Sequence, residues 1–190
     1  MPTFYEGEPV AELDYKLTRE DYEQAFLLAD RWISPMHRRG VKAGISLCIS
    51  ALAASFIPAY LSWYETALVP ISIIAAGIVC ACFFLFVQPG LTRSYAGQMF
   101  STNPLLGVEN HIKIYRDSLQ VKNQYETYGE YWTDFSRCVE DDSFFVLSGG
   151  VCRNLFIIPK KGLDEATKET LSRHFENTFV AKYRRDGRHL

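Results

Sequence analysis

The sequence predicts an α+β membrane protein that combines a two-helix transmembrane hairpin with an antiparallel sheet of about five to six strands and a closing C-terminal helix. Residues 43–64 and 67–87 contain no Asp, Glu, Lys or Arg. Each run is long enough to cross a bilayer, which takes about 20 apolar residues. Residues 108–158 contain short runs in which apolar and polar residues alternate, a pattern that is typical of strands. A mostly apolar stripe then recurs every four residues from Leu163 to Phe179, which predicts an amphipathic helix.

The first forty residues predict a strand followed by a helix. Apolar and polar residues alternate over residues 10–17, which predicts a strand. Thr18 is a suitable N-cap for a helix over residues 19–33, and the first turn of that helix contains acidic residues. No short apolar core begins the chain, so we expect no secretory signal peptide. The sequence divides into an N-terminal strand and juxtamembrane helix, a transmembrane hairpin and a cytoplasmic sheet-plus-helix domain, over residues 1–40, 41–88 and 104–181.

The charges around the two spans predict their orientation. Only Glu65 and Thr66 separate the spans, so the helices must return antiparallel, and Trp63 and Tyr64 at this turn suit the headgroup zone. The turn has no Lys or Arg, so the positive-inside rule places both termini in the cytoplasm of a multi-pass protein in the plasma (inner) membrane. The cations expected to contact the membrane surface are Arg31, Arg38, Arg39, Lys42 and Arg93.

The interior of the hairpin predicts an anchor more than a conduction path. No ionisable residue lies at mid-depth, where transporters and proton relays usually place one. Pro58 and Pro70 predict kinks near the outer end. Small residues allow close packing between helices; they are Ala51, Ala54, Ser55, Ala75, Ala76 and Gly77.

The polar region after the spans predicts a meander of strands. Pro89 and Gly90 weaken the second helix, and residues 91–101 predict a juxtamembrane helix. Gly149-Gly150 predicts a hairpin before a last strand over residues 151–158. The predicted strands before it lie in residues 108–116, 119–122, 125–139 and 144–147.

Basic residues at the end of the sheet form a second candidate site. Arg153, Lys160 and Lys161 would together make a basic patch for lipid headgroups or a partner; the simpler interpretation is ordinary solubilising charge. The basic tail over residues 182–189 is likewise either a frayed, solvated end or a contact with anionic lipid.

Other residue types point to no catalytic, metal or cofactor site. The histidines have no metal-ligand spacing, and we expect surface or edge positions for His37, His111, His174 and His189. Residues 140–142 are three carboxylates that suit a solvated turn, or alternatively a cation site. Trp132 suits a core position, or alternatively an aromatic binding face. We expect free, buried thiols at Cys48, Cys80, Cys82, Cys138 and Cys152.

The order of these signals resembles the YcxB-like family of small bacterial membrane proteins. The segments that carry the resemblance are 15–22 (YKLTREDY), the charge-free hairpin, 111–119 (HIKIYRDSL), Tyr131-Trp132 and 155–161 (LFIIPKK). A twisted antiparallel sheet closed by one C-terminal helix is also the layout of pleckstrin-homology-like domains. The resemblance implies a cytoplasmic domain fixed to the membrane and carries over no catalytic residue. It also implies that the N-terminal strand and helix pack on the C-terminal domain, with the hairpin inserted between them.

These observations predict a membrane-anchored, non-enzymatic interaction or regulatory module. Its expected partners are the lipid bilayer and a protein partner of unknown identity, or a second copy of the chain. The net charge of −2 gives no polybasic signal for nucleic acid. The alternative is a subunit of an oligomeric channel or transport assembly, and an enzyme acting on lipid or envelope substrates is the least favoured interpretation.

Overall fold

The computed structural model describes residues 7–33, 38–61 and 68–186, and it falls into two compact units. The first unit contains Met1–Ala29 together with Ala96–Leu190, and the second contains Asp30–Tyr95. The N-terminal segment and the C-terminal domain therefore belong to one unit, into which the hairpin is inserted.

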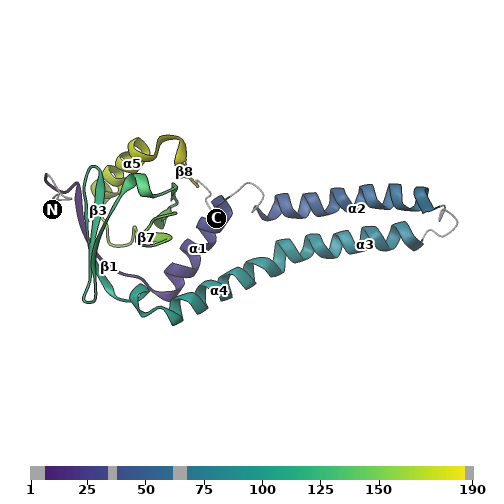
Figure 1. Cartoon of the computed structure of the whole chain (residues 1–190), viewed down its shortest axis with the longest axis horizontal. Coiled ribbons are helices and arrows are strands. Elements are labelled where there is room, and N and C mark those ends of the chain that lie inside the picture. The colour runs from purple at the N-terminus through teal and green to yellow at the C-terminus, as the bar shows by residue number, and fades with distance from the viewer. Residues whose placement is uncertain (1–6, 34–37, 62–67, 187–190) are drawn as a thin grey trace. The chain divides into compact units, whose positions relative to one another are not determined.

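The first unit holds eight strands and a C-terminal helix within the described residues (Figure 1). The strands are β1 (Ala11–Lys16), β2 (Glu109–Ile114), β3 (Ser118–Lys122), β4 (Thr127–Tyr131), β5 (Arg137–Glu140), β6 (Phe144–Ser148), β7 (Leu155–Pro159) and β8 (Tyr183–Arg185). The helices are α1 (Arg19–Ile33), most of which lies in this unit, α5 (Glu165–Phe179) and the short 3-10 turns η3 (Pro104–Leu106), η4 (Trp132–Asp134) and η5 (Val180–Lys182).

The first sheet has the order β1-β2-β3-β4 and is antiparallel throughout. Leu13 of β1 pairs with Ile112 of β2, and Ile112 pairs in turn with Val121 of β3. Because side chains alternate along a strand, this register places the buried apolar residues on one face. The pairing confirms that the N-terminal strand packs on the C-terminal domain.

The second sheet has the order β7-β6-β5-β8, in which β8 runs parallel to β5. The prediction of a single meander of five to six strands was therefore wrong: residues 7–33, 38–61 and 68–186 contain eight strands, in two sheets. The expected strand over residues 125–139 is divided by η4, where the chain passes from the first sheet to the second. The final strand of the meander begins at Leu155, because residues 149–154 form the loop after β6.

Helix α5 covers the core between the sheets with its predicted stripe. Leu171, Phe175 and Phe179 are all buried, as expected. The Phe175 ring lies 5.2 Å from the Phe145 ring and 5.5 Å from the Trp132 ring, both in edge-to-face geometry. Trp132 is therefore a core residue, which confirms the favoured interpretation.

Helix α1 packs against the end of α4 (Gln88–Thr102). The Tyr22 and Phe100 rings lie 5.8 Å apart. A Cβ atom on Gly97 would lie 2.6 Å from the side-chain ends of both Arg19 and Glu23, so the two elements approach closely here, and a larger residue would make those flexible side chains shift. Arg19 and Glu23, one turn apart on α1, form an ion pair with each other at 2.8 Å.

The second unit is a helical hairpin. Helices α2 (Arg39–Leu61) and α3 (Leu68–Cys82) pack on each other, and both α2 and the helix that begins at Leu68 are long and apolar enough to cross a membrane. Gly77 provides the contact, because Ser46 Oγ donates to its carbonyl and Ser50 lies against its Cα. The predicted turn residues 63–66 lie outside the described residues.

The second long helix continues past the predicted weak point at Pro89 and Gly90, and α4 contains the juxtamembrane helix predicted over residues 91–101. A π-helical segment, η2 (Phe83–Val87), joins α3 to α4, so the chain stays helical through Pro89 and Gly90. The Gln88 N–H bonds the Phe83 carbonyl, which is the wider spacing of a π-turn. A π-turn next to proline accommodates the missing donor without breaking the helix. Pro70 lies at the third residue of α3, where no intrahelical bond is lost.

Candidate functional site

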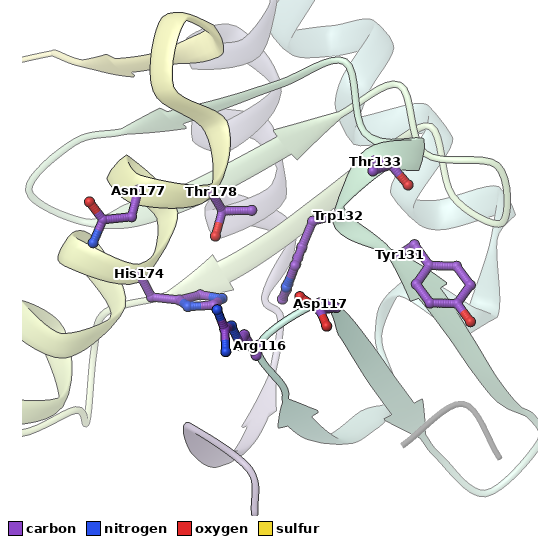
Figure 2. Close-up of a pocket in the computed structure, with 8 residues that line it drawn as sticks. All are labelled: Arg116, Asp117, Tyr131, Trp132, Thr133, His174, Asn177 and Thr178. Carbon is purple, nitrogen blue, oxygen red and sulfur yellow. The ribbon is translucent and has the colours of Figure 1, made fainter. Parts of the chain in front are cut away.

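A pocket of about 630 Å³ lies between α5, η4 and the turn that joins β2 to β3. Figure 2 shows the side chains that line it, with the His174 ring and the Trp132 indole close to Arg116 and Asp117 of the turn. The pocket is lined by Arg116, Asp117, Tyr131, Trp132, Thr133, His174, Asn177 and Thr178. Its size is within the range of small-molecule sites.

Trp132 fixes the β2–β3 turn to the core. Its indole Nε1 donates to the Tyr115 carbonyl at 3.1 Å, and its backbone N–H donates to the Asp117 carbonyl at 3.1 Å. The indole is buried against Phe175, so its position is set by packing. Two hydrogen bonds and a buried ring together hold the turn at the mouth of the pocket.

His174, on α5, forms the wall of the pocket that faces this turn. It lies on the margin of the buried stripe, one residue before Phe175, and its ring meets Trp132 edge-on at 5.6 Å. Burial lowers the pKa of His174, and Asp117 opposes part of this effect, so the imidazole is neutral at pH 7. Its Nε2 atom is closed off from solvent and has no hydrogen-bond partner among the described residues. The expectation of an edge position is confirmed, but the unpartnered nitrogen was not anticipated.

The remaining polar groups give the pocket hydrogen-bonding capacity of both kinds. Arg116 supplies donors and Asp117 supplies acceptors from adjacent positions in the turn, and both residues are exposed. Asn177 and Thr178 of α5 supply an amide and a hydroxyl. No group of His, Cys, Asp or Glu in the described part of the chain has a metal-binding arrangement. The arrangement is suited to holding a polar molecule.

Lys160 is not a surface cation, so the predicted patch with Arg153 and Lys161 was wrong. Its Nζ lies 2.7 Å from Glu140 Oε1 and donates to the Asp141 carbonyl at 2.5 Å. The ammonium also lies 4.4 Å from the centre of the Phe145 ring. The β7 strand ends beside β6, which directs Lys160 back into the domain instead of toward solvent.

Glu140 is the centre of a buried network that the sequence did not indicate. Ser172 Oγ donates to its Oε1 at 2.8 Å, and Tyr183 donates to its Oε2. Burial raises the pKa of Glu140, but the hydrogen bonds from Lys160, Tyr183 and Ser172 outweigh it and hold the pKa below its usual value. Residues 140–142 are thus not one solvated turn, because only Asp141 and Asp142 occupy the turn.

Arg153 lies in a different cluster from either lysine. It bonds Glu126 and stacks over the Tyr128 ring at 5.4 Å, whereas Lys161 is exposed. Nearby Glu130 is buried and accepts backbone N–H bonds from Val151 and Cys152. Desolvation raises the pKa of Glu130 despite these two bonds. Alternation along β4 explains why Tyr128 and Glu130 share one face, and Glu126 directly precedes the strand in the same alternation.

The cations predicted at the membrane surface lie at the end of the hairpin opposite its turn. Arg39 and Lys42 are in the first turns of α2, and Arg93 is in α4 beyond the π-segment. The Arg38 guanidinium lies 4.7 Å from the centre of the Trp32 ring, and Arg31 lies in the last turn of α1. Connectivity therefore gathers all five where the hairpin joins the rest of the chain.

The structure corrects two further predictions, one for the C-terminal tail and one for the burial of the cysteines. Tyr183–Arg185 of the expected frayed tail forms β8, and the Asp186 N–H donates to the Glu140 carbonyl at 2.7 Å. All five cysteines are free, as expected, but only Cys138 is buried. His37 and His189 lie outside the described residues.

Comparison of the chain with protein-family models, with curated proteins and with solved structures finds no match.

Proposed function

We propose that this chain is a membrane-anchored, non-enzymatic binding module. In this proposal the α2–α3 hairpin spans the plasma (inner) membrane, and the sheet-plus-helix unit presents its pocket and surfaces in the cytoplasm. Two sheets closed by α5 are consistent with a pleckstrin-homology-like domain and with the YcxB-like family, and we include both assignments in the proposal. The bilayer and an unidentified protein partner are the proposed contacts, with no role for nucleic acid.

The observation that carries the proposal is the exposure of large apolar side chains around the hairpin. Phe56 is 69% exposed, Leu68 72% and Phe86 76%. Exposed apolar side chains are also found at Ile49, Leu52, Ile71, Ile74, Ile78 and Val79. Soluble proteins rarely expose a continuous apolar surface of this extent. A bilayer would cover it, since the hydrocarbon core is about 30 Å thick and a helix rises about 1.5 Å per residue.

The positions of the cations support the proposed orientation. Arg39, Lys42 and Arg93 flank the apolar stretches at the end that connects to the domain. The positive-inside rule would therefore place that end, and both termini, in the cytoplasm.

Single-cysteine labelling tests both anchoring and orientation. In a background without other cysteines, a membrane-impermeant maleimide should label Glu65→Cys in intact cells and Cys152 only after lysis. Cys80, which is exposed on α3, should stay unlabelled until detergent removes the lipid. Labelling of Cys80 in washed membranes would refute anchoring. Labelling of Cys152 in intact cells would show that the orientation is the reverse of the one proposed. Denatured samples of all three provide the reactivity control.

The binding role has a separate test. Tagged full-length chain in nanodiscs should recover a specific protein from solubilised membranes. Recovery of the chain alone under several conditions would count against a protein partner.

The alternative proposal is a subunit of an oligomeric channel or transport assembly. The observation in its favour is a small-residue surface that α2 and α3 leave uncovered, which includes Ala51, Ser55, Ala75 and Ala76. Cross-linking between copies through Cys48 or Cys80 in membranes should then give species above monomer. A purely monomeric product would exclude it.

A further inference from the structure

Helix α5 stops at a residue that does not favour a helix end. Val180 follows the last helical residue with a φ of 43°, and it is the one non-glycine residue with positive φ within residues 7–33, 38–61 and 68–186. Helices commonly turn at glycine or asparagine in this position, because a β-branched side chain at positive φ is strained. The Val180 side chain is 71% exposed, so no buried contact compensates for the strain.

Residues 180–186 form a C-terminal strap that runs from the end of α5 to the edge of the second sheet (Figure 1). The strap consists of η5, the three residues of β8 and Asp186. Its polar contacts with β5 converge on Glu140. Tyr183 donates to the Glu140 carboxylate, and the Asp186 N–H donates to the Glu140 carbonyl at 2.7 Å.

The sequence of the strap contains no signal that stops α5 at Phe179. The next three residues, Val180, Ala181 and Lys182, include no glycine, proline or asparagine. The Val180 N–H already donates to the Glu176 carbonyl, as in an α-helix. If β8 left β5, these residues would be free to continue the helix, and Val180 would return to a negative φ. Release of the strap therefore removes the strain at Val180.

Release alone would leave β5 uncovered. Cys138, Val139 and Glu140 are each at most 1% exposed, and β8 is the neighbour of β5 on this side of the sheet. Buried backbone groups without partners are unfavourable, and an open strand edge is a template for another strand. A second β8 fits this edge, because it brings the same tyrosine and the same backbone N–H to Glu140.

We propose that two copies of this chain associate by exchanging their C-terminal straps, so that β8 of each copy pairs with β5 of the other. Every contact between strap and domain is remade in the exchanged dimer, and Val180 leaves its strained conformation in both copies. Exchange of an identical element is a low-cost route to a dimer, and a short strained connection favours it. The interaction surface is the edge of β5, and its partner is the β8 strand of a second copy.

Disulfide trapping of the purified full chain in detergent tests the exchange. In a background without other cysteines, Val139→Cys and Arg184→Cys place thiols on paired residues of β5 and β8. Neighbouring strands lie about 4.8 Å apart, which a disulfide can span. Oxidation gives an intrachain disulfide in the closed monomer and an interchain disulfide in the exchanged dimer. We expect an interchain share that rises with protein concentration. An intrachain disulfide alone at every concentration overturns the proposal.

Two single-cysteine chains distinguish exchange from other routes to a covalent dimer. A chain with Val139→Cys and a differently tagged chain with Arg184→Cys are expressed together, so that a mixed disulfide requires β8 of one copy on β5 of the other. We expect mixed product well above the product of either chain expressed alone. Equal amounts overturn the exchange, because a dimer held through the hairpin favours no mixed disulfide between these positions. Exchange needs no bilayer, so it can fail while the cysteine labelling of the hairpin succeeds, and the converse also holds.

Substitutions at Val180 test the role of strain, and light scattering of the chain with its own cysteines measures the dimer without the introduced pair. Val180→Gly removes the steric cost of positive φ, so it should lower the dimer share at least about fivefold. Val180→Ile is the matched control: it keeps a β-branched side chain at an exposed position and should leave the share unchanged. A dimer share that Val180→Gly does not lower overturns the proposal.

Tyr183→Phe separates exchange from simple release. It removes the hydroxyl bond to Glu140, which the closed monomer and the exchanged dimer both contain. Both arrangements should lose the same stability per strap, so the ratio of interchain to intrachain disulfide should not change. A ratio that falls as far as it does in Val180→Gly overturns the proposal, because the dimer then does not contain the strap's native contact.

Discussion

Lys160 Nζ lies 2.7 Å from Glu140 Oε1, and the two side chains retain only 9% and 1% of their solvent exposure. The same carboxylate accepts from Ser172 on α5 and from Tyr183 on β8. One buried anion therefore joins the end of β7, the closing helix and the last strand. Removing Lys160 takes away the nearest cation of this buried anion.

Lys160→Met should lower the free energy of unfolding by about 3–5 kcal/mol, because it leaves the buried Glu140 carboxylate with only the exposed Arg185 guanidinium, 3.7 Å away, as a counter-charge. The double variant Lys160→Met/Glu140→Leu should recover part of this loss. Denaturation of the full chain in detergent, followed by tryptophan fluorescence, measures the effect. Lys168→Met is the control, since its partner Glu165 is 90% exposed and the change should stay within about 1 kcal/mol. A loss no larger than that of the control would mean that the buried pair contributes little.

Two buried carboxylates predict opposite responses to pH. The pKa of Glu140 is lowered in the folded protein, so its stabilisation is present above the unfolded value of about 4.3 and is lost as pH falls through the folded value. The pKa of Glu130 is raised, so stability falls as pH rises from about 4.3 toward its folded value. Glu130→Gln should remove that decline, and Glu140→Gln should remove the loss below about pH 4. Unfolding curves from about pH 3 to pH 7 test both; parallel curves for wild type and Glu130→Gln would contradict the second assignment.

The fold was predictable where one residue pattern decides one element. The charge-free runs identify the two long apolar helices, and the four-residue stripe identifies the buried face of α5 at Leu171, Phe175 and Phe179. The division into two sheets was not predictable, because strand-favouring aromatic residues recur from Tyr125 to Phe135, across β4 and η4, and only the three-dimensional path shows the turn at Trp132.

The site was less predictable, because charge in a sequence does not show burial. Lys160 is adjacent to Lys161 in a motif that suggests a basic surface, yet the first is buried and the second is exposed. Glu140 directly precedes Asp141 and Asp142, and the short strand that it ends, Arg-Cys-Val-Glu, gives no clear signal of its burial. His174 was recognisable as a margin residue, but the pocket depends on Arg116 and Asp117, which are far away in the sequence.

Gly77→Ala should separate α2 from α3. The new Cβ would lie 2.2 Å from Ser50 Oγ and 2.4 Å from Ser50 Cβ, so the helices must move apart. Adding Ser50→Gly should restore the contact, because it moves the small residue to the other helix. Thermal unfolding in detergent compares the stabilities of the wild type, Gly77→Ala and the double variant with Ser50→Gly. Gly44→Ala is the control, because nothing lies within 4 Å of its Cβ position. Equal stability of Gly77→Ala and Gly44→Ala would show that α2 and α3 do not pack through this glycine.

Gly149→Ala should be more destabilising than Gly162→Ala, although both glycines have positive φ, at 86° and 89°. Alanine at Gly162 meets nothing within 4 Å, so only the left-handed backbone opposes it, at about 1–2 kcal/mol. At Gly149 a Cβ would also lie 2.3 Å from Ser136 Oγ and 2.8 Å from Ser136 Cβ, which adds about 1–3 kcal/mol of overpacking.

Ser136→Gly isolates the two causes. It removes both side-chain clashes, so the double variant Gly149→Ala/Ser136→Gly should lose little more than Gly162→Ala once the effect of Ser136→Gly alone is subtracted. The Ser136 hydroxyl also donates to the Ser148 carbonyl at 2.8 Å, and that separate loss is why the single Ser136→Gly variant must be measured. A coupling energy near zero between positions 136 and 149 would leave backbone strain as the whole reason for glycine at this turn.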